Sequence, residues 1–442
     1  MYILEKEKGI NPKILKEFIS KHLEKIKRYD ELEKLYLGKH KILTQKSKEE
    51  YKPDNRIVIN YAKYIVDTFN GFFIGIPVKV RSDNKEVDTF LQEFRKKNFL
   101  DDVEAEISKM TSIYGLAYQL IFQNENSESE VAILSPKKCF LVRDDSIRHN
   151  IVAGVYFNIE KNGSITGELY TLDKVKSFKQ ENGNLEFTDE QEHYYKEVPI
   201  IEYVENAEKM SLIESVETII NAIDKVISEK ANDVDYFSDA YLKILGERLD
   251  QDTIKNLRDN RIINFEGQGT DKMVVEFLQK PDADKTQENL LERLIDSVYQ
   301  ISQVANINDD KFGNISGVAL EYKMLPMRNL AMIKERKFKA SMQKLYKIIL
   351  GVPNSVTMSM ADEWKNLRYL FTRNIPENLR EEAETAGILS SLVSQETALS
   401  TLSIVDDVKD EMERIKKDSQ NELNDYDNNI QLSRFDKGKL NE

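Results

Sequence analysis

The chain has 442 residues, 40% of them apolar and 32% charged, which is enough for two or three domains with a sizeable core. It holds no apolar run long enough to cross a bilayer and no basic start leading into an apolar stretch, so we expect neither membrane insertion nor secretion. The formal net charge of −13 argues against a protein that wraps DNA tightly, because Lys and Arg supply most of the affinity for phosphates.

The first hundred or so residues are predicted to be mainly helical. Residues 10–37 have the periodicity of a charged amphipathic helix, and residues 39–53 form a polar connector. A second helix is expected from Ile57 to Phe73, followed by a short strand at 78–81. Residues 87–114 are predicted to form two helices that divide near Asn98. The aromatic residues at helical spacing are Tyr61, Tyr64, Phe69, Phe72 and Phe73. They are either core or part of a subunit interface, and the sequence does not separate the two.

A β-rich layer follows at 115–205. Alternating or apolar runs occur at 117–122, 131–134, 139–142, 152–158, 167–172, 174–179 and 185–187. Asn162-Gly163 and Asn182-Gly183 each lie between two such runs and predict tight hairpins. A β-rich layer on a helical part indicates an α+β body.

Two long helices are predicted next, at 211–239 and 286–305. Ser211-Leu-Ile-Glu214 predicts a capping box at the start of the first, and Asp284 with Gln287 a capping pair at the start of the second. The first helix spans roughly 40 Å at the usual rise per residue. Its apolar stripe is predicted to pack against that of the second helix, so that both are core and subunit interface. The residues concerned are Ile219, Ile223, Val226, Leu294 and Val298. Between the helices, 240–282 is predicted to form a small α/β insertion, with strands at 241–245, 261–266 and 272–278 and a helix at 251–259.

A polar loop from Asn306 to Gly317 separates the second long helix from a third, Val318 to Leu350. Pro326 lies inside the third helix and should bend it. This helix is basic over 321–350, so it either lines a path for DNA or presents a solvated face. In the loop, Lys311 and Phe312 have the chemistry to meet DNA by phosphate contact or stacking; an ordinary helix connector is the alternative. The acidic end, 418–442, is expected to be flexible.

No catalytic or metal-binding constellation occurs in the sequence. There is no phosphate-binding loop of the Walker type, and His22, His40, His149 and His193 lie far apart. We expect His22 to be a surface residue and Cys139, the single cysteine, to be a small apolar residue in a strand. One cysteine also excludes an intrachain disulfide framework and is typical of a reducing cytoplasm. We therefore predict no enzyme activity, no metal and no cofactor.

Several segments together resemble the Gp6-like (SPP1-type) family of tailed-phage portal proteins. The most specific is Ser316-Gly-Val-Ala-Leu-Glu-Tyr-Lys323, followed by Lys334-Glu-Arg-Lys-Phe338. Tyr36-Leu-Gly-Lys-His40 and the stretch from Asn55 to Asp67 are similar to the N-terminal part of the family. Lys230 to Asp239 and Asn374 to Asn378 are similar to later parts. These matches run in order from about residue 30 to about residue 417.

The resemblance implies a portal fold with an α/β wing, long stem helices, a small α/β clip and a helical crown. Residues 1–210 would be the N-terminal wing, 211–239 and 283–305 the stem, and 240–282 the clip. Residues 306–317 would be the channel loop, 318–376 the kinked helix and C-terminal wing part, and 377–442 the crown with its acidic tail. The loop residues facing DNA would be Asn308, Asp309, Asp310, Lys311, Phe312 and Asn314.

The resemblance also implies a function without a reaction of its own. The chain would form a homo-oligomeric ring, normally of twelve copies, at one capsid vertex of a virion assembled in the bacterial host cytoplasm. Double-stranded DNA would pass through it non-specifically. Its partners would be the terminase large subunit, the major capsid or scaffolding protein and a head–tail adaptor, with no membrane involved. Two alternatives remain open at this point: a nucleic-acid-processing subunit of the packaging machinery, and a non-viral helical scaffold protein.

Overall fold

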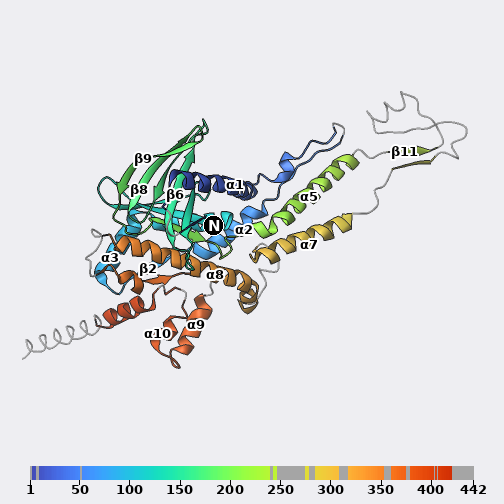
Figure 1. Cartoon of the computed structure of the whole chain (residues 1–442). Helices are drawn as coiled ribbons and strands as arrows, with labels where there is room; N and C mark the ends of the chain where they lie inside the picture. The colour runs from blue at the N-terminus through green and yellow to red at the C-terminus, as the bar shows by residue number, and fades with distance from the viewer. Residues whose placement is uncertain are drawn as a thin grey trace, which may run out of the picture. The chain divides into compact units, whose positions relative to one another are not determined.

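The structure is a computed structural model that describes residues 2–5, 9–49, 52–238, 242–245, 274–277, 284–307, 317–352, 360–374, 379–402, 404–405 and 407–420 (Figure 1). It divides into two compact units, Met1–Asn374 and Ile375–Glu442. The second unit holds α9 (Leu379–Leu389), α10 (Gln395–Leu399) and a helical stretch at 408–420. All sheets described below belong to the first unit, and helices and strands together confirm the predicted α+β class.

The N-terminal helices begin at asparagine caps. Asn11 accepts a hydrogen bond from the Ile14 N–H at the start of α1 (Pro12–Tyr36). Asn60 does the same for the Lys63 N–H at the start of α2 (Tyr61–Ile74). The predicted start of this second helix at Ile57 is therefore wrong by four residues. The cause is tertiary: the N–H groups of Ile57 and Ile59 donate to side chains of a later helix, so this stretch stays extended.

The predicted division near Asn98 is confirmed. Helix α3 (Lys85–Lys97) ends there, and α4 (Leu100–Tyr114) starts after Phe99, whose φ is 49°. Gly115 then ends α4 with a φ of 87°, and a Cβ at that position would lie 2.1 Å from the Lys209 carbonyl oxygen. Only glycine fits this close approach, which joins the helical part to the first strand of the β layer.

The β layer consists of two main sheets. The larger has six strands in the order β1-β5-β6-β7-β8-β9, and the smaller has the order β10-β3-β4. Their bounds are β1 Tyr2–Leu4, β3 Leu116–Gln123, β4 Ser129–Leu134, β5 Cys139–Asp144, β6 Ile151–Ile159, β7 Ile165–Tyr170, β8 Lys174–Glu181, β9 Asn184–Glu192 and β10 Ile200–Val204. Both predicted Asn-Gly hairpins are confirmed, between β6 and β7 and between β8 and β9. The sequence pattern missed three strands that are short or that pair with a strand far away in the sequence. They are β1, β10 and β13 (Arg368–Leu370), the last of which pairs with β2 (Lys79–Arg81).

Helix α1 covers one face of the larger sheet. Leu15, Phe18 and Ile19 are buried in one cluster with sheet residues that include Phe140 and Phe157. These three positions lie on one side of the helix, as the predicted amphipathic pattern requires. The sheet and its covering helix thus form a rigid body next to the long helices.

The long helices are α5 (Glu217–Ser238), α7 (Asp284–Ser302) and α8 (Gly317–Leu350). The predicted capping box is only half formed: the Glu214 carboxylate accepts from the Ser211 N–H at 3.1 Å, but the Ser211 hydroxyl donates to the Ser112 carbonyl. Residues Glu214–Val216 consequently form a 3₁₀ turn, and α5 starts at Glu217. The predicted cap at Asp284 is wrong, because this residue is already the first of α7.

Between α5 and α7 in the chain, β11 (Leu242–Leu245) pairs antiparallel with β12 (Val274–Phe277). This agrees with the first and last predicted strands of the insertion. The predicted helix at 251–259 and strand at 261–266 lie outside the described residues. Pro326 lies inside α8, and in Figure 1 the first turns of that helix run at an angle to its orange remainder, as a proline predicts.

The expected surface position of His22 is wrong. Its side chain is buried between α1 and the larger sheet, where Nδ1 lies 2.8 Å from the Tyr2 hydroxyl and Nε2 lies 2.8 Å from the Pro136 carbonyl oxygen. A carbonyl only accepts, so Nε2 donates and Nδ1 accepts from Tyr2. The partner strand β1 has only three residues and is too short to predict, which is why the helix pattern alone placed His22 on the surface.

Burial lowers the pKa of His22 to about 4, against 6.5 for an exposed histidine. Between pH 6.5 and pH 4 the unfolded state therefore binds a proton at His22 that the folded state does not bind. The contribution of the neutral side chain to the free energy of unfolding is complete above pH 6.5 and is lost as the pH falls toward 4. The loss is on the order of 3 kcal/mol for a shift of this size. We predict that His22→Gln flattens the dependence of the free energy of unfolding on pH over this range, measured by urea titration.

Candidate assembly surface and channel region

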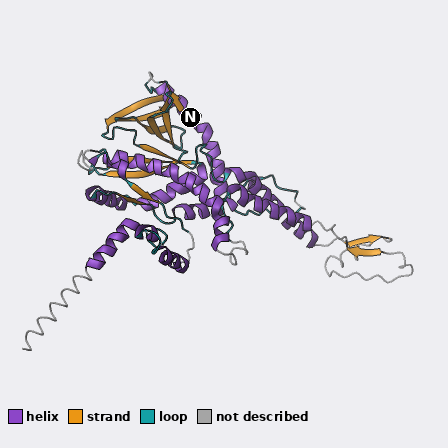
Figure 2. Cartoon of the chain, turned by 90° about the horizontal axis from the view of Figure 1, so that it is seen from below, coloured by secondary structure: helices purple, strands orange, loops and turns teal. Residues whose placement is uncertain are grey.

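Helices α5 and α7 pack side by side as an antiparallel pair (Figures 1 and 2). Of the residues predicted to line this pair, Ile223 and Val298 are fully buried, and Ile219, Val226 and Leu294 are half-buried. Polar contacts join the same faces, from Lys230 to Glu288 and from Gln287 to Asp233. Leu290 and Ile301 of α7 remain exposed at the edge of this stripe. The apolar surface of the pair is thus only partly covered within one copy of the chain.

The described residues between α1 and α2, 39–49 and 52–60, are here called the connector; they include the predicted polar connector 39–53 and the extended stretch up to α2, and they contact α5. Its backbone N–H groups at Asn55, Ile57 and Ile59 donate to Asn232, Ser228 and Asp224 at 2.6–2.9 Å. Two ion pairs, Lys41–Glu217 at 2.6 Å and Lys48–Glu229 at 2.7 Å, extend the contact to both ends. The hydrogen bond from Lys48 lowers the pKa of Glu229. A segment with a polar sequence is therefore a fixed layer of the structure.

The strongest link between connector and α5 is buried. His40 Nδ1 lies 2.5 Å from the Asp224 carboxylate, and neither side chain is exposed. His40 Nε2 lies 3.0 Å from the Leu35 carbonyl oxygen at the end of α1. Asp224 thus ties together the end of α1, the connector and α5. The sequence analysis missed this pair, because the two residues are 184 positions apart and nothing local couples them.

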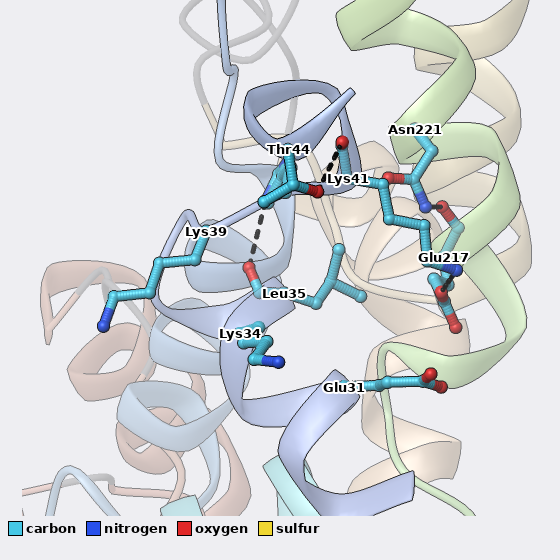
Figure 3. A pocket seen from close by; sticks show the side chains of 9 residues that line it. Glu31, Lys34, Leu35, Lys39, Lys41, Thr44, Glu217 and Asn221 are labelled. Atoms are coloured by element: carbon cyan, nitrogen blue, oxygen red, sulfur yellow. Dashed lines mark hydrogen bonds and ion pairs between the residues drawn. The ribbon is translucent and has the colours of Figure 1, made fainter. Parts of the chain in front are cut away.

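A cavity of about 320 Å³ opens beside this link (Figure 3). Glu31 and Lys34 of α1 lie on one side of it and Glu217 and Asn221 of α5 on the other, with the Lys41 side chain reaching across to Glu217. The Asn221 side-chain amide donates to the Glu217 carbonyl, while its buried oxygen has no hydrogen-bond partner among the described residues. The rim is therefore polar and charged rather than shaped for an apolar ligand.

The start of the predicted channel loop is anchored by aromatic residues. The Ile307 N–H donates to the Tyr64 hydroxyl at 3.1 Å. The rings of Tyr64 and Tyr61 each make an edge contact with Tyr299 of α7. The six predicted DNA-facing residues, Asn308, Asp309, Asp310, Lys311, Phe312 and Asn314, lie outside the described residues. The chain that leads into them is held against α2.

Helix α8 is mainly a core element in its middle. Lys334 is buried, with its ammonium 2.7 Å from the Glu205 carboxylate and 2.8 Å from the Ser112 hydroxyl. Burial lowers the pKa of Lys334, while Glu205 favours its charged form. The buried face of the helix is largely apolar elsewhere, with Phe338 and Leu345 fully enclosed and Ser341 donating its hydroxyl to the Glu202 carbonyl. Of the two readings of this basic helix, neither applies to Lys334, which faces neither DNA nor solvent.

Cys139 lies in a strand, as the sequence predicts. Cys139 is buried in β5, and burial raises the pKa of its thiol well above the usual value. Among the described residues no group of three or more His, Cys, Asp or Glu side chains is placed to hold a metal ion. No described helix is long and apolar enough to cross a membrane.

Comparison with known proteins adds to this geometry. The family described as "Phage portal protein, SPP1 Gp6-like" matches residues 15–425. A portal protein of Bacillus phage SPP1 is 25% identical over 406 residues, covering 86% of this chain and 78% of the relative. A portal protein of Clostridium phage phiCD119 is 24% identical over 407 residues, covering 85% and 88%. Because the family match covers residues 15–425 of 442, this chain belongs to the SPP1 Gp6-like family of phage portal proteins.

Proposed function

We propose that this chain, as a phage portal protein, forms a closed ring at one vertex of the capsid and that double-stranded DNA passes through its centre. The observation that carries the proposal is the family match over 15–425, which spans all the long helices. The partly exposed apolar stripe of the α5–α7 pair supports a role in assembly, since such surfaces are normally covered by a partner. We further propose twelve copies per ring in the capsid, and assembly in the bacterial cytoplasm.

We propose a separate role for each part of the chain. Residues 1–210, with about 350–376, would form the wing, and 211–239 with 283–305 the stem. The clip at 240–282 would dock the terminase large subunit and later a head–tail adaptor. The wing or the crown at 377–442 would meet the capsid or scaffolding protein. None of these docking and assembly roles requires a chemical reaction, and we propose that the chain catalyses none.

The loop 306–317 is proposed to face the channel. Asp309 and Asp310 repel phosphates, whereas Lys311 and the amides of Asn308 and Asn314 can touch them. The net charge of −13 also weakens adhesion to DNA. Together, the repelling and the attracting groups would make a weak, sequence-independent contact that lets DNA slide.

The first test is the size and shape of the purified protein. We predict that light scattering gives the mass of a particle with roughly ten or more copies of the 51.4 kDa chain, because a closed ring of this kind needs many subunits. Negative-stain images should show rotationally symmetric particles with a central hole. A monomer or small dimer at micromolar concentration would contradict the proposal and favour a scaffold protein of another kind.

The second test concerns the clip. We predict that replacing 240–282 by a short Gly-Ser linker between α5 and α7 leaves ring assembly at least partly intact, because β11 and β12 pair only with each other in the described structure. Terminase should no longer bind, so stimulation of its ATPase by the ring should disappear. Retained stimulation would mean that the docking surface lies elsewhere.

The third test concerns the loop. Removing Asn308–Asn314 should leave melting temperature and ring formation near wild type, because these polar residues offer little to a core, but should sharply reduce packaging of full-length DNA. Tyr64→Phe, which deletes the hydroxyl that holds Ile307, should reduce packaging in the same direction. Tyr61→Phe keeps the same ring contact with Tyr299 and serves as the matched control. Loss of rings together with packaging would make the loop a structural connector instead.

A further inference from the structure

Helix α8 carries apolar side chains on two opposite sides. One side is buried and includes Met324, Met327, Ala331 and Phe338. The opposite side is exposed between residues 322 and 340, and at about 100° per residue its members fall within roughly a third of the helical circumference. They are Tyr322, Leu325, Pro326, Asn329, Met332, Ile333, Arg336 and Ala340. We call this set the outer face of α8.

The outer face is unusual for a surface helix, whose solvent side is normally polar. The exposed fractions are 73% for Tyr322 and 47–48% for Leu325, Met332 and Ile333. Pro326 lies on the same face, and a proline bends a helix away from its own side because its ring clashes with the preceding turn. The outer face is therefore the convex side of the bend, with large apolar side chains both before and after Pro326. A helix that is apolar on both sides is typical of an interior position.

The charges around the outer face are mostly positive. Arg328, Arg336 and Lys337 lie on it or at its border, and none of them has a charged partner among the described residues. Of the two acids in α8, Glu335 pairs with Arg373, which leaves Glu321 in the first turns. Residues 321–350 hold eight Lys or Arg against two Asp or Glu, so the rest of the chain is more acidic than the net charge of −13.

A polar pocket of about 280 Å³ adjoins the outer face at Pro326. Its walls include Tyr299, Gln300 and Gln303 at the end of α7, and Lys323 and Pro326 of α8. Projecting apolar side chains beside a polar recess are the usual anatomy of a protein interface. The opposite side of α8 is fixed by the buried pair of Lys334 and Glu205, which lowers the entropy cost of binding a partner.

The chemistry of the outer face favours protein over DNA as its partner. DNA would attract the arginines, but its phosphates offer nothing to Leu325, Met332 and Ile333, which would stay in contact with water. A protein surface covers apolar and cationic groups together. In a ring, every copy has a second copy beside it, and that neighbour is acidic outside its own α8.

We propose that the outer face of α8 packs against an acidic, partly apolar surface of the neighbouring copy. Ring contacts join two different surfaces of the same chain, so the contacted surface lies outside α8. This inference rests on the proposed ring and adds to its interface a helix outside the α5–α7 pair.

The experiment compares two matched substitutions in the full-length chain. Leu325→Asp places a charge on the outer face, and Leu172→Asp makes the same change in the turn between β7 and β8. The two leucines are 47% and 51% exposed, so both variants should fold, which circular dichroism and thermal melting verify. A carboxylate enclosed at every contact is costly, and we expect the fraction of chains in rings to fall roughly tenfold or more for Leu325→Asp. Leu172→Asp should assemble as the wild type does.

Photo-crosslinking identifies what covers the face, and it decides the matter if Leu325→Asp does not fold. p-Benzoylphenylalanine in place of Tyr322 keeps an aromatic side chain and reacts with whatever lies against it. We expect covalent dimers on denaturing gels, with the second cross-linked residue on another copy of the chain and outside α8, as mass spectrometry of the peptides can show.

Three results would overturn the inference while leaving the ring intact. They are a normal yield of rings from folded Leu325→Asp, cross-links that stay within one chain, and cross-links only to added double-stranded DNA. A wild-type chain that forms no ring would overturn the proposed function and this inference together.

Discussion

The carboxylate of Asp224 is the point on which the packing of α5 against the N-terminal helices depends. It accepts hydrogen bonds from His40 and from the Ile59 N–H, and it is fully buried on α5. A buried carboxylate is stable only when its oxygens are paired, and removing one partner typically costs several kcal/mol. The pair therefore holds α5 against the connector and the end of α1.

A second buried charge, that of Lys334, anchors α8. Lys334 reaches Glu205 after β10 and Ser112 near the end of α4, so one ammonium joins α8 to two other elements. Arg95 repeats the arrangement further along, pairing with Glu104 and with the Tyr346 hydroxyl of α8. Helix α8 is thus held at two charged points along a largely apolar face.

Local patterns predicted most of the elements, and long-range partners account for what they missed. The Asn-Gly turns, the break near Asn98 and the two stem helices are specified by residues next to them in sequence. Strand β1 forms because it pairs with β5, about 140 residues later, and α5 starts late because the Ser211 hydroxyl bonds to Ser112. His22 and His40 are buried by partners that no local window contains.

Local patterns likewise predicted only part of the candidate site. Apolar periodicity predicted the stripe on α5 and α7, and the resemblance supplied its role in a ring. The sequence predicted a polar connector over 39–53 and a helix from Ile57. The N–H groups of Asn55, Ile57 and Ile59 are instead bonded to side chains of α5, and neither composition nor periodicity reports such backbone bonds to a distant helix.

The larger sheet ends in two strands that discourage further pairing. At one edge β1 is only three residues long, and at the other β9 carries Glu186, Asp189, Glu190 and Glu192. Short or acidic edge strands prevent sheets of neighbouring molecules from joining through their free N–H and C=O groups. Many identical copies close together around one vertex would otherwise be at particular risk of such cross-linking. The sheet is thereby kept as an isolated body in each copy, and ring closure is left to helices, whose side chains determine which neighbour fits.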